Sequence, residues 1–214
     1  DWYRKLTGDA DMIAAAGNSL LIAVVSAALA TVLGTLAALA LHRYRIRGLA
    51  FLVFTPVAMP EILLGVSLLV FFIQVLHLTL GLVSVIAAHV TFSIGFVAVV
   101  VRARLAGMDE SIFEAARDLG ASEWTSFRLV TLPLILPSVV AGALMAFTLS
   151  LDDFVITFFT AGVGTSTLPL QIFTMIKVAV TPEVNAVSTL LMLVTLAVIV
   201  LASCVAPDAL RAGR

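Results

Sequence analysis

The sequence predicts an all-α fold, a polytopic bundle of membrane-spanning helices, and three observations carry that prediction. Of the 214 residues, 62% are hydrophobic and only 12% are charged, whereas a soluble domain carries about 25% charged residues. Five apolar stretches each reach the roughly 20 residues that a helix needs to cross the hydrocarbon core of a bilayer. The stretches lack the alternating pattern of barrel strands, and backbone groups in lipid must pair within their own segment, so helices are expected.

The composition also excludes several classes of protein. So few charges cannot solvate a globule of this size, which argues against an ordinary soluble enzyme and against a disordered chain. The formal net charge of −1 provides no basic field to attract nucleic acid. Because Cys204 is the one cysteine of the sequence, an internal disulfide or a cysteine-based metal cluster is impossible.

The five apolar stretches are the predicted membrane spans. The first contains no charge, the second carries the single acid Glu61, and the fourth carries Asp152 and Asp153 near its end. A polar loop connects the third span to the fourth. In chain order, the predicted spans are residues 18–41, 49–76, 82–101, 134–160 and 186–205.

Small residues mark one face of the first span and one face of the fourth. In each set they recur at every fourth position, which brings them to the same side of a helix. Small side chains let helix backbones approach closely, because lipid provides no hydrophobic drive for helix association. We therefore expect both faces at helix–helix contacts. The residues are Ser26, Ala30, Gly34 and Ala38 in the first span, and Gly142, Ala146 and Ser150 in the fourth.

The second span places a carboxyl group deep in the membrane. Glu61 follows Leu49 by twelve residues, which is roughly 18 Å along a helix and near the bilayer midplane. Pro56 and Pro60 each remove a backbone donor, so a kinked helix with free carbonyls is expected beside the carboxylate. An ionisable residue at this depth is a functional candidate, and a path for a cation is one interpretation. The other is a buried carboxyl that is protonated or paired with a neighbouring subunit.

Two further acids are expected toward the outer leaflet. Asp152 and Asp153 follow Pro137 by fifteen and sixteen residues, roughly 22–24 Å along a helix. They form either an acidic entry for a cation or part of the water interface. Beyond them, residues 168–177 are predicted to form a short amphipathic helix outside the membrane, as a contact for another protein or as an interfacial strap.

The polar loop is predicted to form a helix–glycine–helix elbow outside the membrane. Residues 109–119 have the pattern of a short helix, and Gly120 stands where a helix ends in a left-handed conformation. Ser122 can cap a second short helix over residues 123–130. Pro133 is expected to end that helix and to turn the chain back toward the bilayer.

The positive charges predict the orientation. Nine of the 12 Lys and Arg residues fall on the side of the 102–133 loop and three on the other side, and such an excess marks the cytoplasmic side. The loop and the C-terminus are therefore expected in the cytoplasm, and the Asp1 end outside. An outside N-terminus without a signal-peptide pattern leads us to expect a further span upstream of these residues.

The loop also contains an acid–alanine–alanine triplet, a glycine four residues further on and a Leu-Pro pair at its end. These residues are Glu114, Ala115, Ala116, Gly120, Leu132 and Pro133. Their spacing resembles the EAA motif of ABC importer permeases, EAA-x3-G-x9-I-x-LP, with Val130 in place of the isoleucine. The resemblance implies that these residues dock into an ATPase subunit.

Four other segments extend the resemblance over nearly the whole chain. They are HRYRIRG at 42–48, MPEI at 59–62, SLDDF at 150–154 and VTPEVNA at 180–186. These segments resemble the permease subunits of spermidine/putrescine importers. The resemblance implies a type I ABC importer transmembrane domain (MetI-like) over residues 1–214, with the first span of the family preceding this region.

The resemblance further implies the partners of the chain. A second permease subunit would pair with it as a heterodimer, ATPase subunits would bind the two loops, and a periplasmic binding protein would deliver the substrate at the bacterial inner membrane. No glycine of the sequence is followed by lysine, so a Walker A loop is absent and ATP must bind to a partner. We therefore expect a non-catalytic transport subunit in contact with membrane lipid, without a cofactor or nucleic acid.

The expected function is polyamine import by alternating access, and two alternatives stay open. Permease loops look alike across ABC importers, so the cargo could instead be an opine, iron, thiamine or another small solute. A secondary transporter or channel driven by an ion gradient would need no ATPase partner and would have little use for a capped cytoplasmic elbow.

Overall fold

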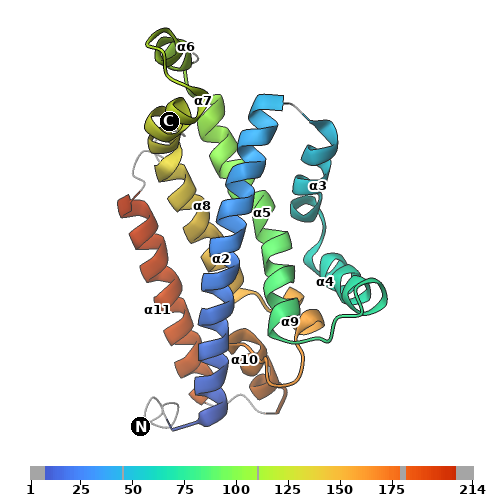
Figure 1. The fold of residues 1–214 in the computed structure, drawn as a ribbon. Coiled ribbons are helices and arrows are strands. Elements are labelled where there is room, and N and C mark those ends of the chain that lie inside the picture. The colour runs from blue at the N-terminus through green and yellow to red at the C-terminus, as the bar shows by residue number, and fades with distance from the viewer. Residues whose placement is uncertain (1–7, 45, 110, 179–181, 206–214) are drawn as a thin grey trace.

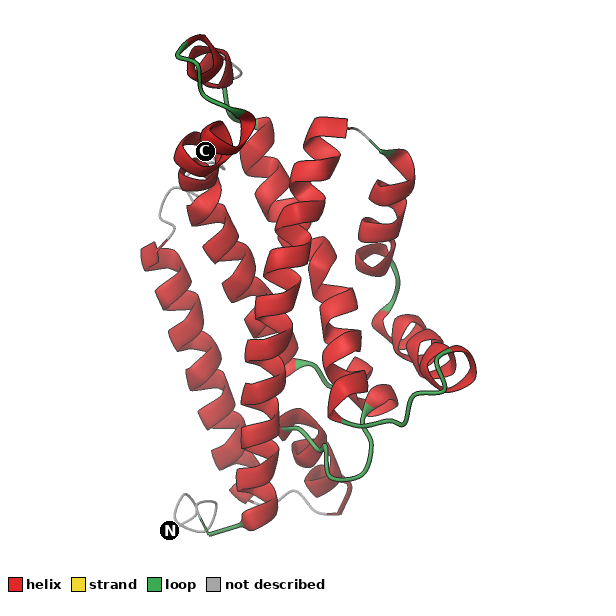
Figure 2. Cartoon of the chain, in the orientation of Figure 1, coloured by secondary structure: helices red, strands yellow, loops and turns green. Residues whose placement is uncertain are grey.

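The computed structural model describes residues 8–44, 46–109, 111–178 and 182–205, and each regular element within these ranges is helical (Figure 1, Figure 2). The predicted all-α class is therefore confirmed. In chain order, the elements are α2 (Ala10–Tyr44), α3 (Arg47–Ala58), α4 (Glu61–Val70), the π-helical turn η1 (Phe71–Val75), α5 (Leu82–Ala106), α6 (Ser111–Asp118), α7 (Glu123–Ser126), the π-helical turn η2 (Phe127–Thr131), α8 (Leu132–Asp152), α9 (Val155–Thr160), α10 (Leu168–Val178) and α11 (Pro182–Val205).

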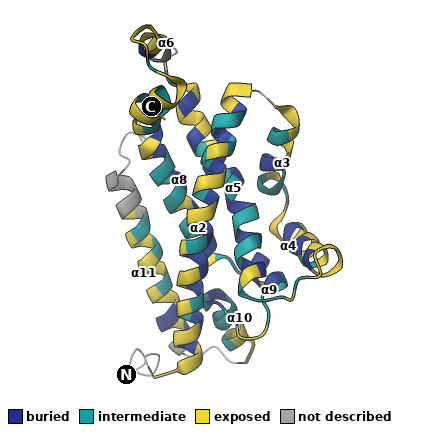
Figure 3. Ribbon diagram, in the orientation of Figure 1, coloured by how far each residue is buried: buried dark blue, intermediate teal, exposed yellow. Residues whose placement is uncertain are grey.

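The long helices α2, α5 and α8 pack together at the centre of the bundle (Figure 1). All seven small residues of the two predicted faces are buried, and Figure 3 shows the buried side of α2 turned toward its neighbours. A Cβ on Gly34 of α2 would come within 2.7 Å of the Val97 Cβ of α5. A Cβ on Gly142 of α8 would come within 3.3 Å of the Val97 Cγ1. The expected close helix–helix contacts are therefore confirmed.

The second predicted span differs from a kinked helix. It is broken into α3 and the segment Glu61–Val75, and the two are bent by 115°. Met59 and Pro60 are both extended, with ψ of 142° and 134°, because a proline ring disfavours helical geometry in the residue before it. Pro56 lies inside α3 without ending the helix. The chain therefore turns sharply at the level where a continuous helix was expected.

The entry into the fourth predicted span also differs from expectation. Pro133 does not turn the chain, since one helical path runs from Glu123 to Asp152. Before it, η2 has the wider π-helical geometry, in which the N–H of Leu132 donates to the carbonyl of Phe127 five residues earlier. Pro133 follows this π-helical turn, whose wider geometry accommodates a residue without an N–H inside a continuous helix.

Three helical segments among the described residues are long and apolar enough to cross a membrane: Ala10–Tyr44, Leu82–Ala106 and Glu123–Asp152. The bent pair of α3 and α4 is a fourth if it counts as one span. The helix α11 covers the fifth predicted stretch, and the predicted short helix is present as α10. The elements α6 and α7 lie at one end of the bundle, and α10 and the start of α2 lie at the other (Figure 1).

Candidate functional site

The elbow begins with a glycine-terminated helix. The helix α6 ends at Asp118, and Gly120 adopts a φ of +78°. The N–H of Gly120 donates to the carbonyl of Arg117, and the N–H of Ala121 donates to that of Ala116. This pair of bonds is the Schellman pattern that closes a helix at a left-handed glycine. The prediction that a helix ends at Gly120 in a left-handed conformation is therefore confirmed.

Two polar side chains cap the helices of the elbow. The Ser122 Oγ accepts the N–H of Thr125 at 3.2 Å, at the start of α7, as predicted. At the start of α6, the Asp109 carboxylate accepts the N–H of Ser111 at 2.9 Å, and this bond lowers the pKa of Asp109. Each cap satisfies a donor that the first turn of a helix leaves free.

The predicted docking residues fall on two parts of this region. Glu114, Ala115 and Gly120 are exposed, whereas Ala116 is only 8% exposed because it faces into the turn. Leu132 is half-buried and Pro133 is exposed, both in the first turn of α8. The motif therefore covers the elbow and the root of the helix that follows it.

Large apolar side chains also face outward here, and the sequence analysis missed them. Leu119, Trp124 and Leu129 are 88%, 69% and 68% exposed. Apolar groups gathered on a segment outside the bundle are typical of a protein contact surface. The sequence feature that could have indicated this surface is Trp124, which stands two residues after the capping Ser122.

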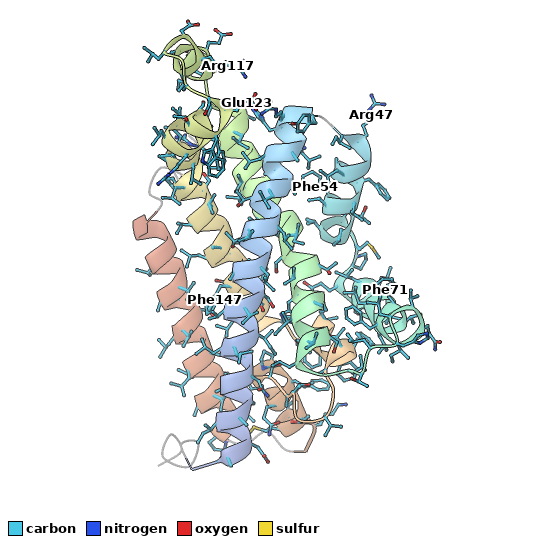
Figure 4. The ribbon with its side chains drawn as sticks, viewed as in Figure 1. Arg47, Phe54, Phe71, Arg117, Glu123 and Phe147 are labelled. Carbon is cyan, nitrogen blue, oxygen red and sulfur yellow. The ribbon has the colours of Figure 1, made fainter. Side chains whose placement is uncertain are left out.

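An ion pair joins the elbow to the end of α2. The Arg43 Nη2 lies 2.8 Å from the Glu123 Oε1, and both side chains are largely exposed. Figure 4 places Glu123 and Arg117 together at this end of the molecule. Such an exposed pair contributes only about 0–1 kcal/mol to stability, and it is a direct contact between α7 and the end of α2.

Glu61 is the first residue of α4, directly after the break, and its side chain is exposed. A helix N-terminus carries a partial positive charge that favours a carboxylate. The helix behind it is held against α9, since a Cβ on Gly65 would come within 2.7 Å of the Phe159 ring. The packing of α4 thus fixes the position of Glu61 beside the bundle.

The two adjacent aspartates have different surroundings. The side chain of Asp153 is 7% exposed; its Oδ2 accepts the N–H and hydroxyl of Thr157 at 2.8 and 2.9 Å, and its Oδ1 accepts the N–H of Ile156 at 3.2 Å. Asp153 therefore caps α9. The Nε2 of His89 from α5 lies 3.2 Å from the Asp153 Oδ2, and this buried imidazole is a partner that the sequence analysis did not identify.

Asp152 instead lies on an open groove between α8, α10 and α11. The groove has a volume of about 530 Å³, and neither Glu61 nor Asp153 contributes to its lining. The three predicted acids are therefore not gathered into one cluster. The lining residues are Asp152, Pro169, Ile172, Ser188, Leu191, Met192, Thr195 and Leu196.

The sequence is similar to curated transport permeases. It is 45% identical over 208 residues to the spermidine/putrescine transport system permease protein PotC of Haemophilus influenzae, covering 96% of this chain and 80% of that protein. It is 44% identical over 210 residues to PotC of Escherichia coli, covering 97% and 79%. It is also 44% identical over 200 residues to the putrescine transport system permease protein PotI of Escherichia coli, covering 89% and 71%.

Solved structures show the same fold at low sequence identity. The methionine ABC transporter MetNI in an inward-facing conformation matches with a TM-score of 0.77 at 20% identity, covering 92% of this chain and 95% of that chain. A bacterial ABC transporter that imports alginate matches with a TM-score of 0.79 at 17% identity, covering 97% and 82%. The expected ABC importer permease fold is therefore confirmed.

Residues 30–212 match the family described as binding-protein-dependent transport system inner membrane component. This match spans most of the chain and includes the elbow, the break before α9 and the groove. By its sequence, its fold and its elbow, the chain belongs to this family of membrane transport permeases.

Proposed function

We propose that the chain is the membrane permease subunit of an ATP-driven importer of polyamines, and that its partners bind and hydrolyse the ATP. The observation that carries the proposal is the elbow, a capped and glycine-closed pair of helices beyond the long apolar helices. The permeases named for spermidine and putrescine transport, at 44–45% identity, support the choice of cargo. A secondary transporter would have no use for such an elbow.

The elbow is the part that docks into the ATPase subunit. In this proposal Glu114 and Ala115 meet the ATPase surface, and the exposed apolar side chains beside them enlarge the contact. Ala116 and Gly120 shape the turn from within, since one is buried and the other holds the left-handed conformation. Leu132 and Pro133, at the root of α8, pass the movement of the elbow to the bundle.

The charge distribution supports a cytoplasmic elbow in a bacterial inner membrane. Every arginine among the described residues lies at the elbow end of the bundle, whereas Lys177 lies on α10 at the other end. Positive charge gathers on the cytoplasmic side of membrane proteins. The α10 end, with the Asp1 end of the chain, then faces the periplasm. The described arginines are Arg43, Arg47, Arg102, Arg104, Arg117 and Arg128.

Transport then follows by alternating access between two permease subunits. ATP binding closes the ATPase subunits, the elbow moves with them, and the helices joined to it exchange an inside opening for an outside one. ATP and a binding protein must each contact the two states differently for this exchange to occur. The solved alginate transporter includes a complex with its periplasmic protein, which supports a binding-protein partner here, with a second, different permease as the other half.

The acids provide the cation path of this proposal. A polyamine has ammonium groups joined by apolar stems, so it is matched by carboxylates beside apolar walls. Asp152 lies on a groove of mainly apolar lining, and Glu61 is exposed at the break between α3 and α4. We assign Glu61 and Asp152 to direct contact with the cation, and Asp153 to the same path through the helix that it caps.

The test is uptake of labelled spermidine and putrescine by the transporter assembled from its permease, ATPase and binding-protein subunits. The variant carrying both Glu61→Gln and Asp152→Asn is expected to take up either polyamine at least about tenfold more slowly, the effect of about 1.4 kcal/mol. The control Asp11→Asn removes an exposed acid at the start of α2 and is expected to leave uptake unchanged.

Three outcomes would each contradict a part of the proposal. Unchanged uptake by the double variant removes both acids from the path. If the parent transporter ignores polyamines but imports thiamine, an iron chelate or an opine, the cargo is wrong while the permease assignment stands. Absence of any ATPase from the purified complex would reject the ATP-driven mechanism itself.

A further inference from the structure

We propose that His89 is a positioning residue for the cation path: it holds Asp153 in the core and thereby keeps Asp152 facing the groove. The proposal rests on the proposed function in one respect, that a cation enters this groove. It assigns distinct tasks to two neighbouring aspartates, and it gives a task to a histidine that the transport mechanism has so far left unused.

The hydrogen bonds around His89 form a directed chain. A carboxylate only accepts, so the Thr157 hydroxyl donates to the Asp153 Oδ2 at 2.9 Å. The Thr157 Oγ1 is then left to accept from the Nε2–H of His89 at 2.9 Å. In the neutral ring the Nδ1 in turn accepts the Ser150 hydroxyl, which lies 2.6 Å away. Ser150, His89, Thr157 and Asp153 are thus linked in one sequence of donors.

These hydrogen bonds connect three helices at the place where the fourth predicted span is interrupted, between the end of α8 and the start of α9. His89 is on α5, Ser150 is in the last turn of α8, and Thr157 is in α9. Between the latter two lies Asp153, whose ψ of 128° ends α8. The imidazole is 2% exposed, so water cannot substitute for these bonds. The angle between α8 and α9 therefore depends on the ring.

The acceptor capacity of Asp153 is already used. A carboxylate offers about four acceptor positions; Asp153 receives three hydrogen bonds, and the Nε2 of His89, which also bonds the Thr157 Oγ1, lies 3.2 Å from its Oδ2. A ligand cation would have to displace these partners. Asp152 is the one ionisable side chain among the residues that line the groove, so a cation in the groove meets Asp152.

Removal of the ring would disturb this division. An apolar residue at position 89 leaves a buried carboxylate and a buried serine hydroxyl with fewer partners, which is costly in a low-dielectric interior. Asp153 would keep its three bonds to α9, but the link from Ser150 of α8 to Thr157 of α9 would be lost. Asp152, at the junction of these helices, would then be free to rotate, so a loss at position 89 is expected to appear at the groove between α8, α10 and α11.

The experiment measures the charge that faces the groove. In the full transporter, with Cys204 replaced by serine, Ser188→Cys places a thiol on the groove wall opposite Asp152. Its rate of reaction is measured with a cationic and with an anionic methanethiosulfonate reagent of similar size. The ratio of the cationic to the anionic rate, divided by the same ratio for a free thiol in solution, is expected to be about 25, because an interaction near 1 kcal/mol, a factor of about five, attracts one reagent and repels the other.

Variants then show whether His89 acts by positioning Asp152 or only by packing within the bundle. Asp152→Asn should bring the rate ratio to about one, and His89→Leu should do the same by turning Asp152 away. His89→Gln, which keeps a donor near the Nε2 position, should restore most of the preference. The matched control Thr91→Val removes a hydroxyl that bonds only within α5 and should leave the ratio unchanged.

The outcomes are decisive in both directions. If His89→Leu keeps the preference for the cationic reagent, or if it lowers the ratio further in the Asp152→Asn background, His89 does not act through Asp152 and the proposal is wrong. If His89→Leu does not assemble, Thr157→Val takes its place with the same expectation. Because the thiol reaction needs no polyamine, a transporter that proves to carry another cargo leaves this result intact.

Discussion

At the scale of single residues, Gly120 has the strictest requirement in the elbow. Its φ is +78°, and nothing lies within 4 Å of the place where a Cβ would stand. A side chain there meets no neighbour, so the cost of a substitution comes from the backbone alone. For an ordinary L-residue that cost is about 1–2 kcal/mol, enough to change the population of the closed turn by a factor of about 5–30.

We predict that Gly120→Ala lowers ATP-dependent polyamine uptake and the amount of ATPase that co-purifies with the permease, while membrane insertion is unaffected. Gly120→Asn should keep more of both, because asparagine tolerates the left-handed region better than alanine. The control is Gly107→Ala at the end of α5, where φ is −92°. Equal uptake by the alanine and asparagine variants, at the parent rate, would show that the left-handed turn is not needed.

At the scale of helices, the features that depend on neighbours in the sequence could be predicted and those that depend on packing could not. The spacing of small residues is local, so the buried faces of α2 and α8 followed from it. The break before Pro60 had a local signal in Met59, the residue before a proline, but its angle of 115° depends on where α4 packs against α9. A single sequence does not contain that contact.

The candidate site divides in the same way. The docking residues followed from the spacing of one motif in one loop. The burial of Asp153 did not, because the imidazole that holds it comes from α5, more than sixty residues earlier in the chain. Asp153 also caps α9 through Ile156 and Thr157, three and four residues further on, whereas the groove around Asp152 depends on the packing of α10 and α11.

We predict that Gly34→Ala destabilises the contact between α2 and α5. The new Cβ would come within 2.7 Å of the Val97 Cβ and 2.8 Å of the Ile94 carbonyl oxygen, so the two helices must separate. Overpacking of this kind costs about 1–3 kcal/mol. The measurement is the thermal denaturation of the purified transporter in detergent, with a lower midpoint expected.

The matched control is Gly17→Ala on the same helix, where a Cβ meets nothing within 4 Å. It should leave the midpoint unchanged or raise it slightly, because alanine favours the helix more than glycine does. If both variants melt alike, close approach at Gly34 does not contribute to stability.

At the scale of the whole molecule, the two ends of the bundle differ in chemistry. One end carries the elbow, the described arginines and the exposed side chains of Leu119, Trp124 and Leu129. The other end carries α10, where the Lys177 ammonium lies 4.5 Å from the centre of the Phe173 ring. This polarity means that a partner at the elbow end and a partner at the α10 end cannot compete for the same surface.

We predict that Ala115→Cys, in a background without Cys204, forms ATP-dependent crosslinks to the ATPase subunit of the assembled transporter. Ala115 is the exposed alanine of the motif pair, so a thiol at this position can reach a partner. The control Val163→Cys changes a fully exposed residue of the loop between α9 and α10 and should not capture the ATPase. A transporter that pumps normally while the Ala115→Cys variant captures no ATPase would contradict the docking assignment.

The unbroken helical path from Glu123 to Asp152 has a mechanical consequence. Its thirty residues span about 45 Å through the π-helical turn η2, with the surface proposed to meet the nucleotide motor at one tip and the carboxylate proposed to face the cargo at the other. A tilt of about 5° about one tip sweeps the other through about 4 Å, more than the length of a hydrogen bond. In the proposed mechanism, one helical path therefore joins the motor contact to the cargo site, and the π-helical turn η2 and Pro137 are the places where it can bend.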